Sequence, residues 1–440
     1  MHCANQGIKM DTVCHPSLSI HPTDGTKYDE LQRAVRPEHR NMFFTADKAH
    51  LIISKRHYET APVVTIQLNH LGVSNLDEVT PETPCIVTFK LNHGVGDGYT
   101  GYLLMQYISD YLSGADLSGY DDVHYGRFLG DDDPQKPWMK KEEFKDVATF
   151  GEKYGIQSDG TPTWVMPNMS ITRQTRFKTI LNNLLFYMIP YLLPMNMDYF
   201  ELRFTADDID EIRNELMNRF SDDHQFKKER LTTFECLTAF LSPLIGKYDS
   251  STGLFKQIHF PLNLRERTTK FGKYTIGNPI HLVAVGVEDE TGSMEYNPSN
   301  VALKIHEALD RNGRIRNDED FTQRITNFLR DFFSVIRVHG FRYSMGLTVT
   351  EILHCQFIIW NEFRSIKPYE KYQFGLDQRP LFYMYNASYS LNRFVLLDAP
   401  DDPKGVRVII QMPRAKAKKL KEAETAFLSK YEVPVDSKSF

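Results

Sequence analysis

The chain has 440 residues, of which 41% are hydrophobic and 25% charged, and its formal net charge is −5. These values are ordinary for a globular enzyme, and they exclude a general attraction for nucleic acid or for an anionic membrane surface. A chain of this length exceeds what one hydrophobic core usually holds, so we expect two domains.

The five cysteines are scattered and form no Cys-x-x-Cys pair. This pattern argues against a disulfide framework and against a zinc site, so we expect no metal and a reducing, cytoplasmic compartment. No hydrophobic run near Met1 resembles a signal peptide. The most apolar stretch, residues 184–195, is too short to span a bilayer and contains Pro190 and Pro194. We interpret it as a buried connection or an exposed strap between domains, with membrane contact as the lesser alternative.

The first half of the chain has strand-like runs separated by turn signals. Residues 3–10 resemble the end of a strand and a turn, and further strands are expected at residues 42–45, 51–54, 63–68 and 85–91. Apolar residues then recur at helical spacing from Leu103 to Leu112. Residues 113–176 are polar and predict a long irregular excursion over the surface.

The second half alternates strands and helices. A strand at residues 199–204 precedes Thr205, which is expected to cap a helix through residue 217, and a second helix begins at Thr232. Further strands are expected at 257–262, 281–287, 381–385, 394–397 and 406–412, with helices at 301–309, at 321–335 and after the last strand. The basic run at 414–421 is interpreted as a solvated helix face. This alternation predicts an α/β fold.

The most informative motif joins the strand at 85–91 to the helix that follows it. It reads His93-Gly-Val-Gly-Asp97-Gly98. An imidazole presented by a strand to a glycine-lined turn, with a carboxylate four residues later, is how a chain can present a general base. A turn histidine bonded to its own backbone is the structural alternative.

Several segments in order along the chain resemble one family, the BAHD acyltransferases, which are CoA-dependent and related to chloramphenicol acetyltransferase and to condensation domains. The motif above resembles their His-x-x-x-Asp-Gly. Further matching segments are Thr232-Thr-Phe-Glu-Cys-Leu-Thr-Ala-Phe-Leu241, Leu262-Asn-Leu-Arg-Glu-Arg267, Ile276-Gly-Asn278, Trp360-Asn-Glu-Phe363, Gln373-Phe-Gly-Leu-Asp377 and Gly405-Val-Arg-Val-Ile-Ile-Gln-Met-Pro413. The resemblance covers essentially the whole chain.

The resemblance implies two chloramphenicol-acetyltransferase-like domains, each a mixed sheet flanked by helices, with a channel between them. The halves would be residues 1–185 and 201–440, joined by a crossover at 186–200. It also implies an acyltransferase that moves an acyl group from acyl-CoA, a co-substrate, to a small alcohol or amine acceptor. No permanently bound cofactor, nucleic acid partner or stable membrane insertion is expected, and we expect a monomer.

The residue roles implied by the resemblance begin with His93 as the general base. Asp97 would either orient His93 or brace the loop through an arginine, and Arg265 and Arg267 are the candidates. Gly98 would let the turn bend. Trp360 and Asn278 are candidate donors to the oxyanion. The remaining assignments are Lys270, Lys273 and Arg379 for the CoA phosphates, and Phe374 and Gly375 for structure.

Three features depart from the family pattern. Gln373 and Leu376 interrupt Asp-Phe-Gly-Trp-Gly, so an ion pair with an arginine would be missing or rerouted. Ile358 stands where some members carry an oxyanion-binding threonine. The opening residues correspond to a strand that in family members lies some tens of residues from the N-terminus. A first strand and helix are therefore expected to be missing, and we expect an exposed sheet edge there.

Two other functions remain open. A catalytically impaired relative acting as a binding or interaction protein would fit the three departures. A condensation-type enzyme fed by a carrier protein is the other alternative, although such enzymes usually show two adjacent histidines and Asn92 precedes His93 here.

Overall fold

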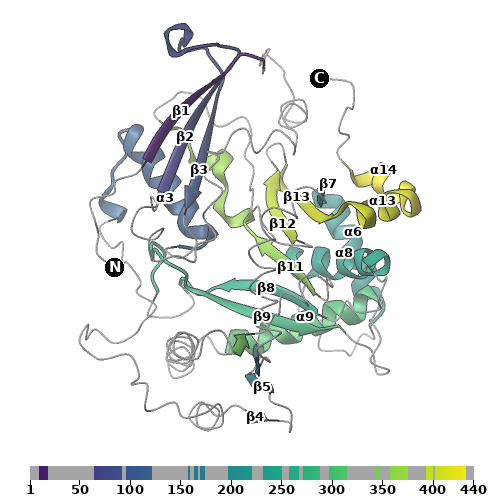
Figure 1. The fold of residues 1–440 in the computed structure, drawn as a ribbon. Coiled ribbons are helices and arrows are strands. Elements are labelled where there is room, and N and C mark those ends of the chain that lie inside the picture. Colours follow the sequence, from purple (N-terminus) through teal and green to yellow (C-terminus); the bar gives the residue numbers. More distant parts are fainter. Residues whose placement is uncertain are drawn as a thin grey trace, which may run out of the picture.

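The computed structural model describes the chain in fifteen segments. They are residues 9–17, 64–91, 96–120, 157–158, 163–166, 169–173, 197–220, 231–249, 257–266, 271–287, 297–314, 343–345, 357–374, 393–399 and 402–432. The strands form three sheets, two of which carry the argument below (Figure 1).

The larger of these two sheets has six strands from the second half of the chain. Their spatial order is β7-β13-β12-β11-β8-β9, and pairing is parallel only between β8 and β11 and between β11 and β12. The strands are β7 (Met197–Phe204), β8 (Gln257–Asn263), β9 (Ile280–Gly286), β11 (Phe357–Glu362), β12 (Arg393–Ala399) and β13 (Asp402–Pro413).

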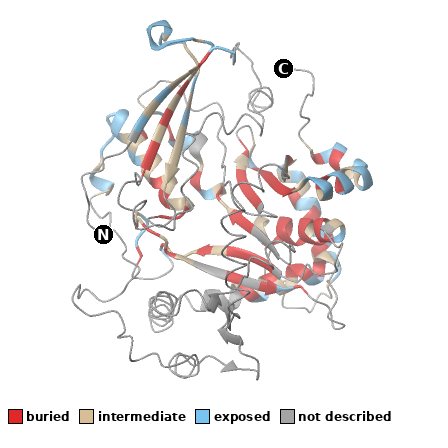
Figure 2. Ribbon diagram, in the orientation of Figure 1, coloured by how far each residue is buried: buried red, intermediate tan, exposed pale blue. Residues whose placement is uncertain are grey.

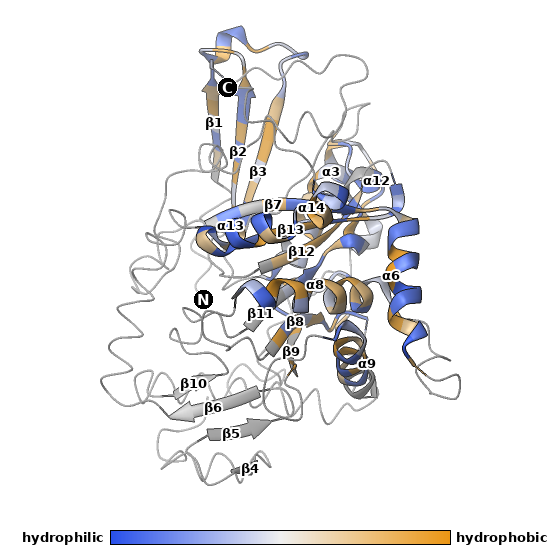
Figure 3. Cartoon of the chain, turned by 90° about the vertical axis from the view of Figure 1, so that its right-hand side faces the viewer, coloured by the Kyte–Doolittle hydropathy of each residue, from blue (hydrophilic) through white to orange (hydrophobic). Residues whose placement is uncertain are grey.

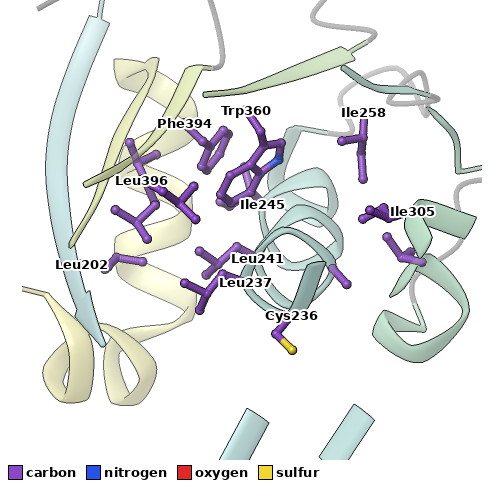
Figure 4. Close-up of a cluster of buried hydrophobic side chains, with 14 of the residues drawn as sticks. Leu202, Cys236, Leu237, Leu241, Ile245, Ile258, Ile305, Trp360, Phe394 and Leu396 are labelled. Atoms are coloured by element: carbon purple, nitrogen blue, oxygen red, sulfur yellow. The ribbon is translucent and has the colours of Figure 1, made fainter. Parts of the chain in front are cut away.

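Helices pack on one face of this sheet. They are α6 (Ala206–Asn218), α8 (Thr233–Asp249), α9 (Pro298–Arg314), α13 (Arg414–Ala423) and α14 (Thr425–Tyr431). Figure 3 shows α8 as hydrophobic along most of its length, whereas α6 and α13 are largely hydrophilic. The main core therefore forms around α8, where it meets the sheet strands (Figures 2 and 4).

Local sequence explains how two of these helices begin. The Thr205 hydroxyl accepts from the backbone N–H of Asp208, and the Asp208 carboxylate accepts from the Thr205 backbone, as expected for a capping box. Thr232 and Glu235 exchange the same two bonds before α8. Side chains within four residues of one another thus set both starts.

The smaller sheet comes from the first half of the chain and has the order β1-β2-β3. Its strands are β1 (Lys9–His15), β2 (Val64–Leu71) and β3 (Cys85–Leu91), and β1 runs parallel to β2. Helix α3 (Gly98–Leu112) follows β3 and lies beside the small sheet (Figure 1). Tyr99 and Tyr102 pack against an apolar cluster that includes Val395 and Ile409 of the larger sheet.

Short elements complete the described residues. A third sheet has the order β10-β6-β5-β4. Its strands are β4 (Gln157–Ser158), β5 (Thr163–Met166), β6 (Met169–Arg173) and β10 (Tyr343–Met345). The short helices are η2 (Leu76–Glu78), η3 (Ser118–Tyr120), η6 (Arg364–Ile366) and α12 (Pro368–Lys371).

The α/β fold class predicted from the sequence is confirmed, and β3 has the predicted bounds. The irregular excursion expected at 113–176 is wrong in part, because β4, β5 and β6 lie within it. Strand β11 was not expected at all. The elements predicted at 42–45, 51–54, 321–335 and 381–385 lie outside the described residues, as does the crossover up to residue 196, so the domain boundaries remain a prediction.

Candidate functional site

The His93 motif spans the junction between β3 and α3. Residues 92–95, which include His93, lie outside the described residues. Asp97 is the N-cap of α3, where its Oδ1 accepts from the backbone N–H of Thr100 at 2.8 Å, and Gly98 is the first helical residue. A Cβ added at Gly96 would lie 2.6 Å from Cγ2 of Thr100, so only glycine fits there.

Asp97 forms a buried, two-bond ion pair with Arg265. Arg265 Nη1 donates to Asp97 Oδ2 at 2.9 Å and Nη2 donates to Oδ1 at 3.0 Å. The two side chains are only 2% and 5% exposed. Such planar, bidentate contacts are the strongest that a carboxylate makes with a side chain. Of the two candidate arginines, Arg265 therefore makes the contact with Asp97, while Arg267 lies outside the described residues.

The remaining donors of Arg265 are also engaged. Its Nε donates to the Thr275 carbonyl at 2.7 Å, Nη1 to Asn263 Oδ1 at 3.1 Å and Nη2 to Thr100 Oγ1 at 2.9 Å. The Tyr99 ring lies 4.8 Å from the guanidinium carbon. All donors of a buried cation are thus satisfied, which a desolvated charge requires.

The segment before Asn278 packs directly on the motif. Asp97 donates its backbone N–H to the Gly277 carbonyl at 2.9 Å, and the Thr100 hydroxyl donates to the same oxygen at 2.7 Å. Gly277 has φ of 136°, a conformation that favours glycine. Asn278 therefore lies one residue from this contact and is partly buried. This placement is compatible with the role expected for it.

Trp360 lies on the other side of the six-stranded sheet, inside the core (Figure 4). The side chain is fully buried, its ring stacks on Phe394 with centroids 4.4 Å apart, and its Nε1 donates to Ser242 Oγ at 3.0 Å. Its one N–H is thereby occupied by a residue of α8. This argues against the oxyanion role expected for Trp360, because strand alternation points its side chain toward the helices.

The segment around Phe374 docks on α3. Gln373 and Phe374 both donate their backbone N–H groups to Ser109 Oγ, at 2.7 and 3.0 Å, and the Tyr372 hydroxyl donates to the Tyr102 carbonyl at 2.9 Å. Among the described residues this contact uses the backbone of Gln373 and not its side chain, so it needs no carboxylate at position 373. Gly375 lies outside the described residues.

Of the residues expected at the CoA phosphates, Lys273 is described and its Nζ lies 5.1 Å from the centre of the Tyr274 ring. Lys270 and Arg379 fall outside the described residues. Burial, and after it the charges of Lys273 and Lys367, lower the pKa of the Lys371 ammonium, whose Nζ donates to the Ser365 carbonyl at 3.4 Å.

Sequence reasoning missed four residues that build the site: Thr100, Ser109, Asn263 and Gly277. Thr100 follows Asp97 by three residues, the spacing of an N-cap contact, so a local signal for it existed. Asn263 lies in the Leu262–Arg267 segment and was within reach of the same reasoning. Gly277 lies in the matched segment Ile276–Asn278, although no role was assigned to it, whereas Ser109 carries no local signal because its partners are distant in the sequence.

Among the described residues no helix combines the length and apolar character needed to cross a bilayer. The same residues contain no group of His, Cys, Asp and Glu side chains able to hold a metal ion.

No protein-family model matches the chain, and no curated protein matches its sequence. Solved structures do match over nearly its whole length. TRI101 of F. graminearum, complexed with coenzyme A and deoxynivalenol, is 10% identical with a TM-score of 0.56, covering 97% of this chain and 82% of that one. TRI101 of F. sporotrichioides, complexed with coenzyme A and T-2, is 13% identical with a TM-score of 0.57, covering 97% and 81%. Vinorine synthase is 11% identical with a TM-score of 0.51, covering 98% and 78%.

These matches establish the fold. The chain has the two-domain, chloramphenicol-acetyltransferase-like fold, with mixed sheets flanked by helices, that was expected from the sequence.

Proposed function

We propose that the chain is an acyl-CoA-dependent acyltransferase of the BAHD type, which transfers an acyl group from the CoA thioester to an alcohol or amine acceptor. His93 is the general base. The observation that carries the proposal is the contact between Asp97 and Arg265, which anchors the end of the His93 loop to the six-stranded sheet. Solved structures with the same fold hold coenzyme A, which supports the choice of donor.

In this mechanism the imidazole takes the proton of the acceptor as the acceptor oxygen or nitrogen attacks the thioester carbonyl. The tetrahedral intermediate collapses, the C–S bond breaks, and the proton passes to the CoA sulfur. No covalent acyl-enzyme is needed, since both substrates meet at His93 and are held there. Asp97 is already engaged by Arg265 and by the backbone of Thr100, so its role is to position the loop.

The phosphates of CoA need cations. Lys270, Lys273 and Arg379 are the candidates for these cations in this proposal.

The experiment is a screen of acyl-CoAs against pooled alcohols and amines, read by release of free thiol. The His93→Ala variant should lose acceptor-dependent thiol release by about 10²–10⁴-fold while its thermal stability and acyl-CoA binding stay near wild type. Near-wild-type turnover by this variant would remove His93 from the mechanism.

A non-catalytic binding protein is the second candidate, favoured by Gln373 in place of the aspartate of the family pattern. Thiol release that depends on an acceptor would rule it out. A carrier-dependent condensation enzyme would instead fail with free acyl-CoA and respond to an acyl-carrier protein.

A further inference from the structure

The face of the six-stranded sheet that is turned away from the helices carries buried polar residues beside the apolar cluster of Val395, Leu397 and Ile409. Side chains alternate along each strand, so the neighbours of core residues such as Leu202, Trp360 and Ile410 point to this other face. The buried polar residues at those positions are Glu201, His259, Asn361, Arg407 and Gln411. Buried polar groups are costly unless they have partners, so their partners matter.

Two of these groups pair with each other, and two amide nitrogens stay unsatisfied. Arg407 and Glu201 form a bidentate ion pair at 2.8 and 3.1 Å. Asn361 Nδ2 and Gln411 Nε2 are shielded from solvent, and neither has a hydrogen-bond acceptor in the described part of the chain. The Asn361 and Gln411 side chains are 7% and 4% exposed. A buried N–H group without an acceptor lowers the stability of the fold. Two such groups on one face therefore indicate that a bound ligand supplies the acceptors.

Strand register places Asn361 close to the anchored motif. β8 and β11 are parallel, with Ile359 beside His259. Continuing this register puts Asn361 beside Pro261, so the next residue of β8 on the same face is Asn263. Because strands rise about 3.3 Å per residue, Asn263 lies about 7 Å further along the strand direction than Asn361. Asn263 accepts from Arg265, which holds Asp97.

The pairing of β11 with β12 also places Asn361 near the start of α3. Val395 of β12 is the direct cross-strand partner of Asn361 and belongs to the apolar cluster on which Tyr99 and Tyr102 pack. These tyrosines belong to the first turns of α3, directly after the motif. Asn361 is therefore on the sheet face that meets the start of α3, opposite the face that buries Trp360.

We propose that Asn361 is the oxyanion donor of this enzyme, in the role expected for Trp360; this rests on the proposed function. The Asn361 carboxamide N–H donates to the thioester carbonyl oxygen, which becomes negatively charged as the acceptor forms its bond to the carbonyl carbon. When the C–S bond breaks, the C=O bond reforms and the acceptor's proton, held by His93, passes to the CoA sulfur. Donors aimed at a developing oxyanion in a dry site stabilise the transition state strongly.

Gln411 serves the same ligand at a different point. It lies on β13, two strands from Asn361. Gln411 pairs with Arg393 of β12, whereas Asn361 pairs with Val395, so the two are also offset by two residues along the strands. With strands about 4.8 Å apart, the two backbones are about 12 Å from each other, too far for one oxygen. The arm that links the thioester to the nucleotide of CoA carries amide carbonyls, and Gln411 donates to one of these. Its bond is present before and during the reaction, so it contributes to binding rather than to kcat.

The test compares Asn361→Leu and Gln411→Leu in the full-length protein, with the best acyl-CoA and acceptor from the screen. Asn361→Leu should lower kcat about 10²–10³-fold, with little change in KM for acyl-CoA, and should raise Tm because an unsatisfied donor is removed. Gln411→Leu should raise KM for acyl-CoA about tenfold and leave kcat within about twofold.

Thr238→Val is the matched control. The Thr238 hydroxyl on α8 is also buried without a partner among the described residues, but it lies on the helix side of the sheet. Its removal should raise Tm and leave both kinetic constants at wild-type values.

A kcat of Asn361→Leu within about threefold of wild type overturns the proposal. If that variant does not fold, Asn361→Asp decides, because it keeps the shape and replaces the donor by an acceptor; it should show the same loss of kcat. An active wild type with unimpaired variants overturns only this inference, whereas a wild type without any acyl transfer overturns the proposed function with it.

Discussion

The buried pair of Asp97 and Arg265 allows a quantitative prediction. Arg265→Met removes the cation and leaves the Asp97 carboxylate, 5% exposed, with no opposite charge beside it. Removing one partner of a buried ion pair typically costs about 3–5 kcal/mol. Against a total stability of about 5–15 kcal/mol, this is a large fraction. Asp97→Asn leaves the Arg265 cation unpaired but keeps a side chain that can cap α3.

The double variant Asp97→Asn/Arg265→Met should be less destabilised than the sum of its two single variants, by about 1–3 kcal/mol, because no unpaired charge stays buried. The free energy of unfolding is measured by urea denaturation for all four proteins. Acyl transfer should fall in each variant, since the His93 loop loses its anchor.

Two other ion pairs serve as controls. Arg407 and Glu201 form a second buried, bidentate pair on β13 and β7, so Arg407→Met should cost a similar free energy. Arg364 and Glu362 have the same bidentate geometry but are 26% and 29% exposed, so Arg364→Met should cost less than about 1 kcal/mol. A cost below about 1 kcal/mol for Arg265→Met, or strict additivity in the double variant, would refute the reasoning.

Three further predictions follow from single sites. Trp360→Phe keeps the stack on Phe394 but loses the bond to Ser242, so unfolding should become about 1–2 kcal/mol easier while kcat stays unchanged; a large fall in kcat would return Trp360 to the active site. Gly96→Ala places a methyl group against Thr100 and should destabilise the fold by about 1–3 kcal/mol, visible as a lower urea midpoint, and an unchanged midpoint would contradict the packing. Burial raises the pKa of the Asp398 carboxyl to about 6, so its ionisation opposes folding as pH rises from about 4 through 6. Asp398→Asn should therefore be about 1–2 kcal/mol more stable than wild type near pH 8, after allowance for solvent screening, with no gain near pH 4; an equal gain at both pH values would exclude the carboxyl as its cause.

Much of the local structure was accessible from the sequence. The start of α6 at Thr205, the strand β3 and the helix after Asp97 all depend on residues within a few positions of one another. Caps, turns and the period of apolar residues act over that range, which is why β3 and α6 were predicted with nearly correct bounds, whereas α3 starts five residues before the apolar run that predicted it. Strand β11 was missed because it has only four consecutive apolar residues, followed by Asn361 and Glu362, and shows no regular alternation.

The sequence by itself determined that an imidazole and a carboxylate stand at a strand-to-helix turn, because motif and turn lie within six consecutive residues. Only the tertiary structure decided what surrounds them. The choice of Arg265 as the partner of Asp97 depends on bringing together residues 168 positions apart. The proposal of Asn361 rather than Trp360 as oxyanion donor depends on which face of β11 the helices cover, since adjacent residues of a strand point to opposite faces. A local pattern can specify such an alternation, but the side that is buried against the helices is set by the packing of the whole sheet.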